Sequence, residues 1–379
     1  MAPDSFKGSL SSVAVAEALA LGWRRGRPDD ETILAPLADG GEGTLEAVAA
    51  TGAWQWLPVA ARDPLGRPRQ ARFLRDGAGR DRAVVELAEA SGLSRLGAGE
   101  LDALTASTFG TGLVLAAAVG LGCRRIVLGL GGSATTDGGS GLLRALGARF
   151  LDAHGAEVSP GGGGLADLAR IDLNGLSPTL AEVELTIASD VTNPLLGELG
   201  AAATYGPQKG ASPEQVTLLD RNLARYADLL EAATGRRVRD ERGAGAAGGT
   251  TFGLLAIAPS FKHLVVRPGV EEVMALTRFD DALAACELVL TGEGRVDAQT
   301  AHGKTALGVA RRAHAAGRPC LCFGGGVTPE GSAALAELGC VVVPVSEGPG
   351  SVEAAMAAGS PPLERAAERT ARLVGLLQR

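Results

Sequence analysis

The chain has 379 residues, of which 46% are hydrophobic, 21% charged and 3% aromatic, and its formal net charge is −7. A domain usually holds roughly 100–200 residues, so this length predicts two domains, and the composition excludes a disordered chain. The few aromatic residues and the negative charge disfavour binding to single-stranded nucleic acid or to anionic membranes, although a local basic cleft would be compatible with this composition. We therefore expect no nucleic-acid partner and no membrane partner.

The N-terminal part of the chain alternates between helices and strands. A helix is predicted from about residue 13, a strand over 32–37 and a second helix from about residue 44. This alternation is typical of βαβ units, whose strands form a parallel sheet.

The middle of the chain has a different pattern. Strands at 70–74 and 83–87 flank an Asp-Gly-Ala-Gly turn, which predicts a hairpin. A helix at 107–121, a strand at 125–130, a glycine loop, a helix near 142–146 and a strand at 148–152 follow, then a flexible loop at 161–164 and a strand at 185–189. The clearest helix covers 212–233, where Ser212 and Gln215 predict a capping box and Pro213 takes the first helical position.

The C-terminal third returns to strand and helix alternation. Strands are predicted at 286–290, 319–323 and 340–345, and helices at 305–316, 330–337 and 362–378. Two α/β ends around a middle of hairpins and helices indicate an inserted domain. We therefore expect two α/β domains: one from residues 1–62 and 284–379, and a mixed-sheet domain from residues 63–283.

Cysteine usage and hydropathy indicate a reduced, cytoplasmic, soluble protein. The five cysteines are scattered without a Cys-x-x-Cys pair, so we interpret most of them as small core residues and not as metal ligands or disulfides. No signal peptide is visible, and the longest apolar run, residues 113–123, is too short to span a membrane.

Glycine is the informative excess, because its 55 residues are about twice the usual share of roughly 7%. Six segments combine glycine with Asp, Ser, Thr or Lys, mostly just after a strand: residues 4–8, 39–44, 131–139, 189–193, 206–210 and 291–305. Ligands of α/β sheets bind beyond the carboxyl ends of the strands, where glycine-rich backbone can cradle phosphate. Any one such segment is more often a turn, but six together favour phosphate chemistry.

Two generic nucleotide motifs give different answers. Gly303-Lys304-Thr305 resembles the end of a P-loop, but Ala298 stands where the first P-loop glycine belongs. The Gly-x-Gly-x-x-Ala string at 129–134, with Asp152 about 20 residues on, fits a dinucleotide fingerprint. Glycines at 138 and 139 fall where its helix should form. A nucleotide-binding dehydrogenase therefore stays an alternative.

Magnesium-dependent phosphoryl transfer needs oxygen ligands, a cation near the developing charge and a base for the attacking hydroxyl. The loops offer such oxygens at Asp39, Glu42, Asp137, Asp190, Asn193, Glu293 and Asp297. Taken one at a time, a residue of this kind is somewhat more often a helix cap or a turn acid than a ligand. Of the four histidines only His302 lies in one of the loops, so histidine-based metal sites and serine–histidine triads have little support.

Lysine is scarce and unevenly placed. Of 36 basic residues only four are lysines, and Lys7, Lys209 and Lys304 lie in the glycine-rich loops while Lys262 does not. A compact ammonium differs from a guanidinium in bulk and donor geometry, so these loops are expected to need lysine specifically.

Taken together, the segments resemble the type-1 glycerate kinase family. The strings that carry the resemblance run in order along nearly the whole chain: APDSFKGSLSS (2–12), LADGGEGT (37–44), ELAEASGL (86–93), GLGGSATTDGG (129–139), ASDVTNPLLG (188–197), YGPQKGAS (205–212), GAGAAGG (243–249) and TGEGRVDAQTAHGKT (291–305). Members usually carry a few apolar residues of a first strand before APDSFKG, whereas here only Met1 precedes it, so we expect that strand to be short.

The resemblance implies ATP-dependent phosphorylation of D-glycerate in the cytoplasm with Mg²⁺. It also implies a flavodoxin-like α/β domain built from both chain ends, with a second α/β domain inserted. The expected product is 2-phosphoglycerate, with 3-phosphoglycerate as the alternative. A non-catalytic sensor of glycerate or nucleotide is an alternative of another class. Both a monomer and a homodimer are compatible with the sequence.

We assign expected roles on this basis. Asp190 should be the base or a metal ligand, with Glu293 and Asp297 near Mg²⁺, and Lys209 and Lys304 should act on the transferring charge. Phosphates should be held by Gly131, Gly132, Ser133, Thr135, Thr136 and Asp137. Glycerate should be bound by Asp4, Ser5, Lys7, Asp39 and Glu42.

Overall fold

The computed structural model describes every residue except 98, 299, 301–304, 349 and 378–379. The chain forms two compact units, and both are α/β, as predicted. Unit 1 consists of Met1–Asp39, Glu46–Gly52 and Gly269–Arg379, and unit 2 consists of Gly40–Leu45 and Ala53–Pro268. No helix within the described residues is long and apolar enough to cross a membrane.

Unit 1 contains a parallel sheet in the order β11 (Cys340–Pro344), β10 (Cys320–Val327), β9 (Val289–Val296). Residues 1–4 continue this sheet beyond β9, because Ala2 N and Asp4 N donate to Leu290 O and Gly292 O at 2.7 and 2.8 Å. The predicted strand at 32–37 lies next to them as an extended segment, since the amides of residues 35 and 37 donate to the carbonyls of residues 1 and 3. Numbered along the chain, the five segments stand in the order 2-1-3-4-5, which is the flavodoxin-like order.

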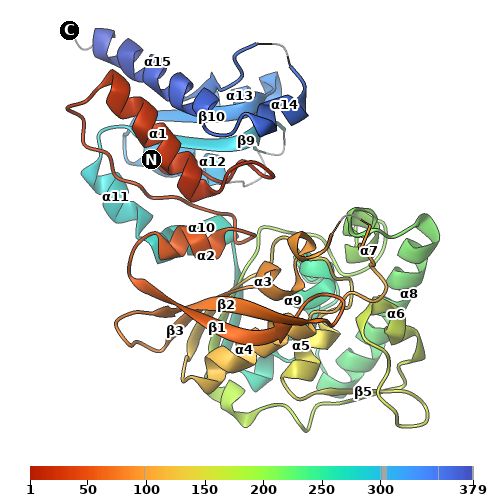
Figure 1. Cartoon of the computed structure of the whole chain (residues 1–379). Coiled ribbons are helices and arrows are strands. Elements are labelled where there is room, and N and C mark those ends of the chain that lie inside the picture. Colours follow the sequence, from red (N-terminus) through yellow and green to blue (C-terminus); the bar gives the residue numbers. More distant parts are fainter. Residues whose placement is uncertain (98, 299, 301–304, 349, 378–379) are drawn as a thin grey trace. The chain divides into compact units, whose positions relative to one another are not determined.

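Helices cover both faces of this sheet (Figure 1). α1 (Ser12–Gly26) and α15 (Pro361–Leu377) lie side by side on one face, and α12 (Thr305–Ala315) and α13 (Pro329–Ala336) lie on the other. Successive strand residues therefore alternate between two cores, as Val289 and Leu290 do. A Cβ atom at Gly22 would lie 2.0 Å from Glu364 O, so only glycine permits this close approach of α1 to α15. The remaining helices of this unit are α10 (Gly269–Thr277), α11 (Phe279–Ala285) and α14 (Val352–Ala357).

Unit 2 contains a six-stranded mixed sheet in the order β1-β2-β3-β4-β7-β8. These strands are β1 (Trp54–Arg62), β2 (Pro68–Asp76), β3 (Arg82–Glu86), β4 (Arg125–Gly129), β7 (Glu184–Ala188) and β8 (His263–Arg267). The pairs β1–β2 and β2–β3 are antiparallel, which confirms the predicted hairpin, while β3, β4, β7 and β8 run parallel. β5 (Arg149–Leu151) and β6 (Arg170–Asp172) form a separate antiparallel pair.

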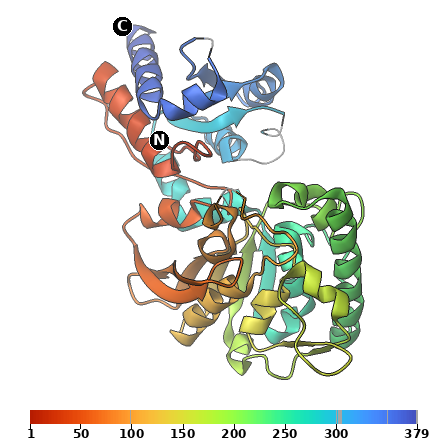
Figure 2. The same cartoon turned by 45° about the vertical axis from the view of Figure 1, so that its right-hand side comes forward.

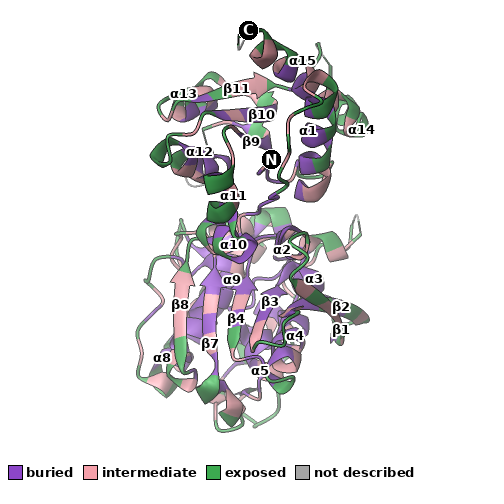
Figure 3. Cartoon of the chain, turned by 90° about the vertical axis from the view of Figure 1, so that its left-hand side faces the viewer, coloured by how far each residue is buried: buried purple, intermediate pink, exposed green. Residues whose placement is uncertain are grey.

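The core of unit 2 packs between this sheet and its helices. α8 (Pro213–Thr234), the long green helix in Figure 2, has the predicted capping box between Ser212 and Gln215. Its Tyr226 packs between the rings of Phe150 and Phe252, at centroid distances of 5.8 and 5.5 Å. In Figure 3 the edge strand β8 is half-buried to exposed, whereas β3 is largely buried. The other helices are α2 (Thr44–Ala49, which begins in this unit), α3 (Ala88–Ser91), α4 (Phe109–Gly120), α5 (Ser140–Ala145), α6 (Gly161–Gly164), α7 (Ala201–Tyr205) and α9 (Ala246–Ala256).

Short 3₁₀ turns complete the fold at Leu93–Arg95, Leu165–Asp167, Pro178–Glu182, Pro207–Lys209 and Ala258–Ser260. The segment 161–164, expected to be a flexible loop, forms the short helix α6. The reason is tertiary: a Cβ atom at Gly162 would lie 2.2 Å from Thr136 O, so this backbone packs directly against another loop.

The two units divide the chain at other positions than the expected boundaries of 62 and 284. β1 pairs with β2 along its whole length, from Trp54 opposite Asp76 to Arg62 opposite Pro68, so it belongs to the sheet of unit 2. α10 and α11 belong to unit 1 because their apolar side chains are buried in its core: Val270, Val273, Met274, Phe279 and Leu283. Strand pairing and the burial of apolar side chains therefore determine where the two units begin and end, and both depend on residues that are distant in the sequence.

Candidate active site

Four parallel strands of unit 2 end in register. Glu86 on β3 is opposite Gly129 on β4, which is opposite Ala188 on β7, which is opposite Arg267 on β8. The glycine-rich loops at 131–139 and 189–193 therefore leave the sheet at one edge, the carboxyl edge, where α/β folds bind ligands. Residues 40–45 join them there, because Gly131 N donates to Gly40 O at 3.3 Å.

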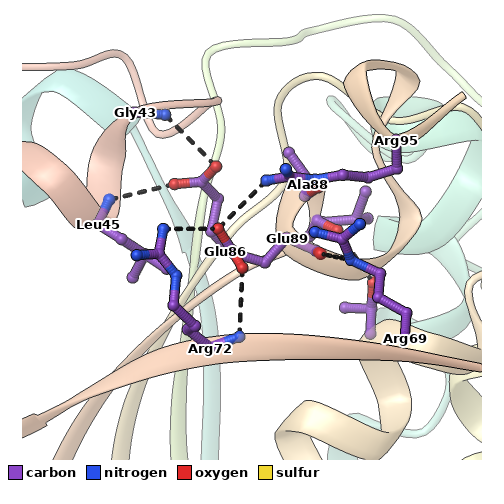
Figure 4. A network of polar contacts seen from close by, with 10 residues as sticks. Gly43, Leu45, Arg69, Arg72, Glu86, Ala88, Glu89 and Arg95 are labelled. Carbon is purple, nitrogen blue, oxygen red and sulfur yellow. Dashed lines mark hydrogen bonds and ion pairs between the residues drawn. The ribbon is translucent and has the colours of Figure 1, made fainter. Parts of the chain in front are cut away.

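Two buried carboxylates at the end of β3 hold the surrounding loops (Figure 4). Glu86, 2% exposed, accepts hydrogen bonds from Gly43 N at 3.4 Å and Leu45 N at 3.1 Å, and so fixes segment 40–45 at the start of α2. Glu89, 4% exposed, accepts from Arg72 N and from the guanidinium groups of Arg72 and Arg95, each at 3.2 Å. Neither acid is among the residues expected from the sequence, although a glutamate that ends a buried strand, followed by a second glutamate three residues later, is the signal that could have found them.

The loop 131–139 is mostly enclosed. Gly131 and Gly132 reach the surface, whereas Ser133 is 7% exposed and Thr135, Thr136 and Asp137 are fully buried. Its glycine backbone approaches segment 40–45 closely, since a Cβ atom at Gly131 would lie 2.3 Å from the Cα of residue 41. The part of this loop that a ligand can reach in this structure is therefore its Gly131–Gly132 end.

Asp137 is surrounded by hydrogen-bond donors of its own unit. Its carboxylate accepts from Thr108 N and Thr108 Oγ1, both at 2.8 Å, from Gly139 N at 3.0 Å and from Gly141 N at 3.2 Å. These contacts tie the loop to the first turns of α4 and α5. Asp137, expected to bind phosphate, thus holds the loop in shape from inside the unit.

Lys209 lies beneath the same loop. Its side chain is 2% exposed, and its Nζ donates to Ser133 Oγ at 2.9 Å and to Thr135 O at 2.6 Å. Burial lowers the pKa of Lys209 to about 7, and the nearby charge of Asp137 acts in the opposite direction. The structure therefore places this lysine against the loop, as a donor to it.

The segment after β7 carries Asp190 and Asn193. Asn193 Nδ2 donates to Leu199 O at 2.8 Å and its Oδ1 accepts from Tyr205 Oη at 2.9 Å, so this amide shapes the turn toward α7. Asp190 is half-buried directly beyond the strand end. Glu42 is exposed, and its Cβ lies 3.6 Å from the position that a Cβ atom of Gly132 would take. Glu42 and the 131–132 end are thus brought together.

Unit 1 gathers a second set of expected residues at the carboxyl edge of its own sheet. Asp4 ends segment 1–4, Asp39 follows the extended segment beside it, and Glu293 lies on β9 on the other side. In a sheet of order 2-1-3-4-5, this is the point where the chain direction of the connections switches, the usual ligand position. Lys7 joins the set, with its Nζ 3.7 Å from Asp39 Oδ2.

The carboxyl of Asp4 is buried and hydrogen-bonded. It is 8% exposed, and it accepts from Ser5 N and from Thr305 Oγ1, both at 2.6 Å. Burial raises the pKa of Asp4 to about 6, and the charge of Asp39 adds to this effect. The same Asp39 raises the pKa of Lys7 and so favours its ammonium form. A carboxyl and an ammonium in this arrangement offer a proton acceptor and an anion partner.

Glu293 and Asp297, expected near Mg²⁺, both have contacts within unit 1. Glu293 is 5% exposed and its Oε1 accepts from Thr300 Oγ1 at 2.5 Å, while Asp297 Oδ2 pairs with Arg295 Nε at 3.0 Å. Among the described residues, no group of three or more histidine, cysteine or carboxylate side chains converges as a metal cage. Mg²⁺ usually takes one or two protein carboxylates and completes its shell with water and phosphate, a set that such single acids fit. Lys304 lies outside the described residues.

The loop geometry differs from that of a dinucleotide fold. β4 ends at Gly129 and α5 begins only at Ser140, so no helix starts at the glycine motif as the pyrophosphate of a dinucleotide requires. Asp152, the expected ribose acid, accepts from His154 N and Ala156 N at 2.8 and 2.9 Å and so closes its own turn.

Comparisons with known proteins concern the family and the fold of the chain. The model of the glycerate kinase family matches residues 1–375. The chain is 42% identical to a glycerate kinase of Bacillus subtilis (strain 168) over 333 residues, which are 88% of this chain and 86% of the relative. It is 41% identical to a glycerate 2-kinase of Escherichia coli (strain K12) over 330 residues, 87% and 85% of the two chains. A crystal structure from Salmonella typhimurium LT2, whose protein is assigned as glycerate kinase 2, superimposes with a TM-score of 0.82 at 40% identity and covers 100% of this chain and 98% of that one.

Proposed function

Because the chain belongs to the glycerate kinase family, we propose that it transfers the γ-phosphoryl group of ATP to the 2-hydroxyl of D-glycerate with Mg²⁺. The observation that carries the proposal is the gathering of the glycine-rich loops at the carboxyl edge of the parallel strands in each unit. The choice of the 2-hydroxyl is supported by the relative from Escherichia coli, which is named a glycerate 2-kinase.

The two carboxyl edges offer different chemistry. In unit 2, phosphate oxygens would approach the Gly131–Gly132 end of the loop at the exposed Gly132, because a glycine without a side chain lets a ligand come close to the backbone. In unit 1, Lys7 would pair with the carboxylate of glycerate, and Ser5 and Asp4 would orient its hydroxyl groups. Mg²⁺ bound to ATP would neutralise the charge of the transferring phosphoryl group. Asp190 within unit 2, and separately Glu293 within unit 1, carry oxygens of the kind that it prefers.

Asp190 has one of two roles, base for the acceptor hydroxyl or ligand of Mg²⁺. Asp190→Asn keeps the size of the side chain, removes the base and leaves only a neutral amide oxygen as a metal ligand, so we expect kcat to fall by about 10²- to 10⁴-fold with an unchanged fold. If Asp190 is the base, the variant should lose the low-pH limb of the kcat profile. If Asp190 is a ligand, the variant should need a higher Mg²⁺ concentration for the half-maximal rate. A kcat close to that of the wild type would make Asp190 a turn residue.

The product decides which hydroxyl accepts the phosphoryl group. ATP and D-glycerate are incubated with the enzyme, and ³¹P and ¹H NMR resolve the two phosphoglycerates. Without a phosphoglycerate mutase in the mixture, we expect 2-phosphoglycerate as the product. Accumulation of the 3-phosphate would contradict the proposed regiochemistry, and binding of glycerate or nucleotide without any phosphorylated product would contradict the kinase proposal.

A further inference from the structure

The loop 131–139 is held from two sides by groups that lie inside unit 2. On one side, the Lys209 Nζ donates to Ser133 Oγ at 2.9 Å and Thr135 O at 2.6 Å. Lys209 ends the short 3₁₀ turn Pro207–Lys209, and Gly210 then takes a left-handed conformation with φ +92° before α8 begins. The turn and the helix start therefore fix the lysine stem from behind.

On the other side, a run of three left-handed residues presses against the same carbonyl group. Ala247, Gly248 and Gly249 have φ values of 51°, 66° and 88°, a conformation that is rare for alanine. A Cβ atom at Gly248 would lie 2.0 Å from Thr135 O, and Gly138 N donates to Gly248 O at 2.9 Å. The Thr135 peptide is thus enclosed between the lysine and this turn.

Lys209 has little surface to offer a substrate. Its side chain is 2% exposed, and of its two acceptors Ser133 is 7% exposed and Thr135 is fully buried. The accessible part of the loop is its other end, at Gly131 and Gly132. A group bound there would meet the backbone that the lysine orders, and would not meet the lysine.

We propose that Lys209 is a positioning residue that fixes the backbone of the 131–136 loop from inside the unit and makes no contact with substrate. The proposal rests on the proposed function for the nature of the ligand, a phosphate group of ATP at the outer end of the loop. It replaces the expectation that this lysine acts on the transferring charge.

The protonation state of Lys209 separates the two roles. A neutral amine keeps two N–H groups, which is enough for its two acceptors, whereas stabilisation of a phosphoryl group requires the ammonium charge. Burial lowers the pKa of Lys209 to about 7, and Asp137 is the charged group that opposes this shift. A positioning lysine therefore keeps its function when the pH rises above 7, and a charge-stabilising lysine loses it.

Hydrogen exchange measured by mass spectrometry tests the proposal on the full chain without substrates. We compare the wild type with Lys209→Met, which removes the donors and keeps the stem, and with Lys262→Met as the control. Lys262 is exposed and pairs at 2.7 Å with Glu184, which begins β7 opposite the first residue of β4, whereas the loop follows the last residue of β4. We expect at least tenfold faster exchange in the peptide that covers 131–139 in Lys209→Met, unchanged exchange in β3 and β4, and wild-type exchange in the control.

Kinetics give the second readout. In Lys209→Met, KM for ATP should rise at least tenfold while KM for D-glycerate stays within about twofold, and the wild-type kcat should not fall between pH 7 and 9. Unchanged loop exchange together with a lower kcat would overturn the proposal, because the lysine would then act on the substrate directly. Equally faster exchange throughout unit 2 would also overturn it, because Lys209 would then be a general core residue.

A second variant keeps the test decisive if Lys209→Met does not fold. Ser133→Ala leaves the lysine in place and removes one of its acceptors. We expect a smaller increase in exchange, confined to the same peptide, and an unchanged loop would contradict the proposal. Since exchange is measured without substrate, its outcome is separate from the outcome for glycerate phosphorylation.

Discussion

The buried carboxyl of Asp4 gives the folded protein a pH-dependent cost. Its pKa is about 6 in the folded chain, against an ordinary value of 3.8 for an aspartate in water. Below pH 3.8 both states are protonated and the cost is absent. Between these two values the folded state binds more protons, so its stability falls as the pH rises, and above pH 6 the full cost is present.

Replacing this carboxyl by an amide should remove the cost. We expect Asp4→Asn to raise the thermal midpoint at pH 7.5 by a few degrees, since the shift of the pKa corresponds to at most about 3 kcal/mol. The gain should shrink toward pH 4. Thermal unfolding followed by circular dichroism from pH 4 to 8 measures it, with the exposed Asp29→Asn as a control. A gain that does not depend on pH would show that burial of the charge is not its cause.

Lys7 tests whether the loops need lysine specifically. Its Nζ lies 3.7 Å from Asp39 Oδ2, whereas Lys262 makes a surface pair with Glu184. We expect Lys7→Arg to lose at least about tenfold in kcat/KM, roughly 1.4 kcal/mol, because a guanidinium has more bulk and another donor geometry. Lys262→Arg should keep the wild-type value. Steady-state kinetics on both variants measure kcat/KM. Equal losses in the two variants would show that the position of a lysine in these loops says nothing about its function.

At the level of single elements, local chemistry predicted much of the fold. α8 is recognisable from its capping box and the spacing of its apolar residues, and the β2–β3 hairpin from its turn. β1 and β8 were missed because their pairing partners, not their own residues, make them strands of this sheet. The left-handed turn at 247–249 was missed for the same reason, since its need for glycine comes from the carbonyl of a residue more than a hundred positions away.

That turn gives a prediction with a matched control. Gly248 and Gly235 have nearly equal φ values of 66° and 71°, but a Cβ atom would meet Thr135 O at 2.0 Å in the first case and nothing within 4 Å in the second. Gly235→Ala should cost about 1 kcal/mol, the price of left-handed backbone. Gly248→Ala should cost several times as much, because the 135 peptide must also move. Urea unfolding measures both, and equal losses would show that the loop contact is absent.

The candidate site shows a similar division. The loops that reach the two carboxyl edges were found from their glycine and acid content, because these residue types are needed there whatever the rest of the chain does. The orientation of individual side chains was not predictable. Asp137 and Asn193 are residue types that often bind ligands. In the structure their side chains instead bond with donors and acceptors of unit 2, which come together only in the folded chain.

At the scale of the whole molecule, each unit is an α/β layer structure whose loops meet at the carboxyl edge of its parallel strands. Family membership follows from agreement along 375 residues, so it does not depend on any single loop. The limits of the units could not be found from composition, because segment 40–45 belongs to unit 2 through Glu86, and residues 46–52 belong to unit 1.

The most direct measurement is ATP consumption as each component is left out in turn. ADP release is followed with the purified full chain, ATP, D-glycerate and Mg²⁺, then without glycerate, and then with EDTA. The account predicts turnover only when all three are present. Equal turnover in EDTA, or no turnover with all three in a sample shown to be folded, would contradict it.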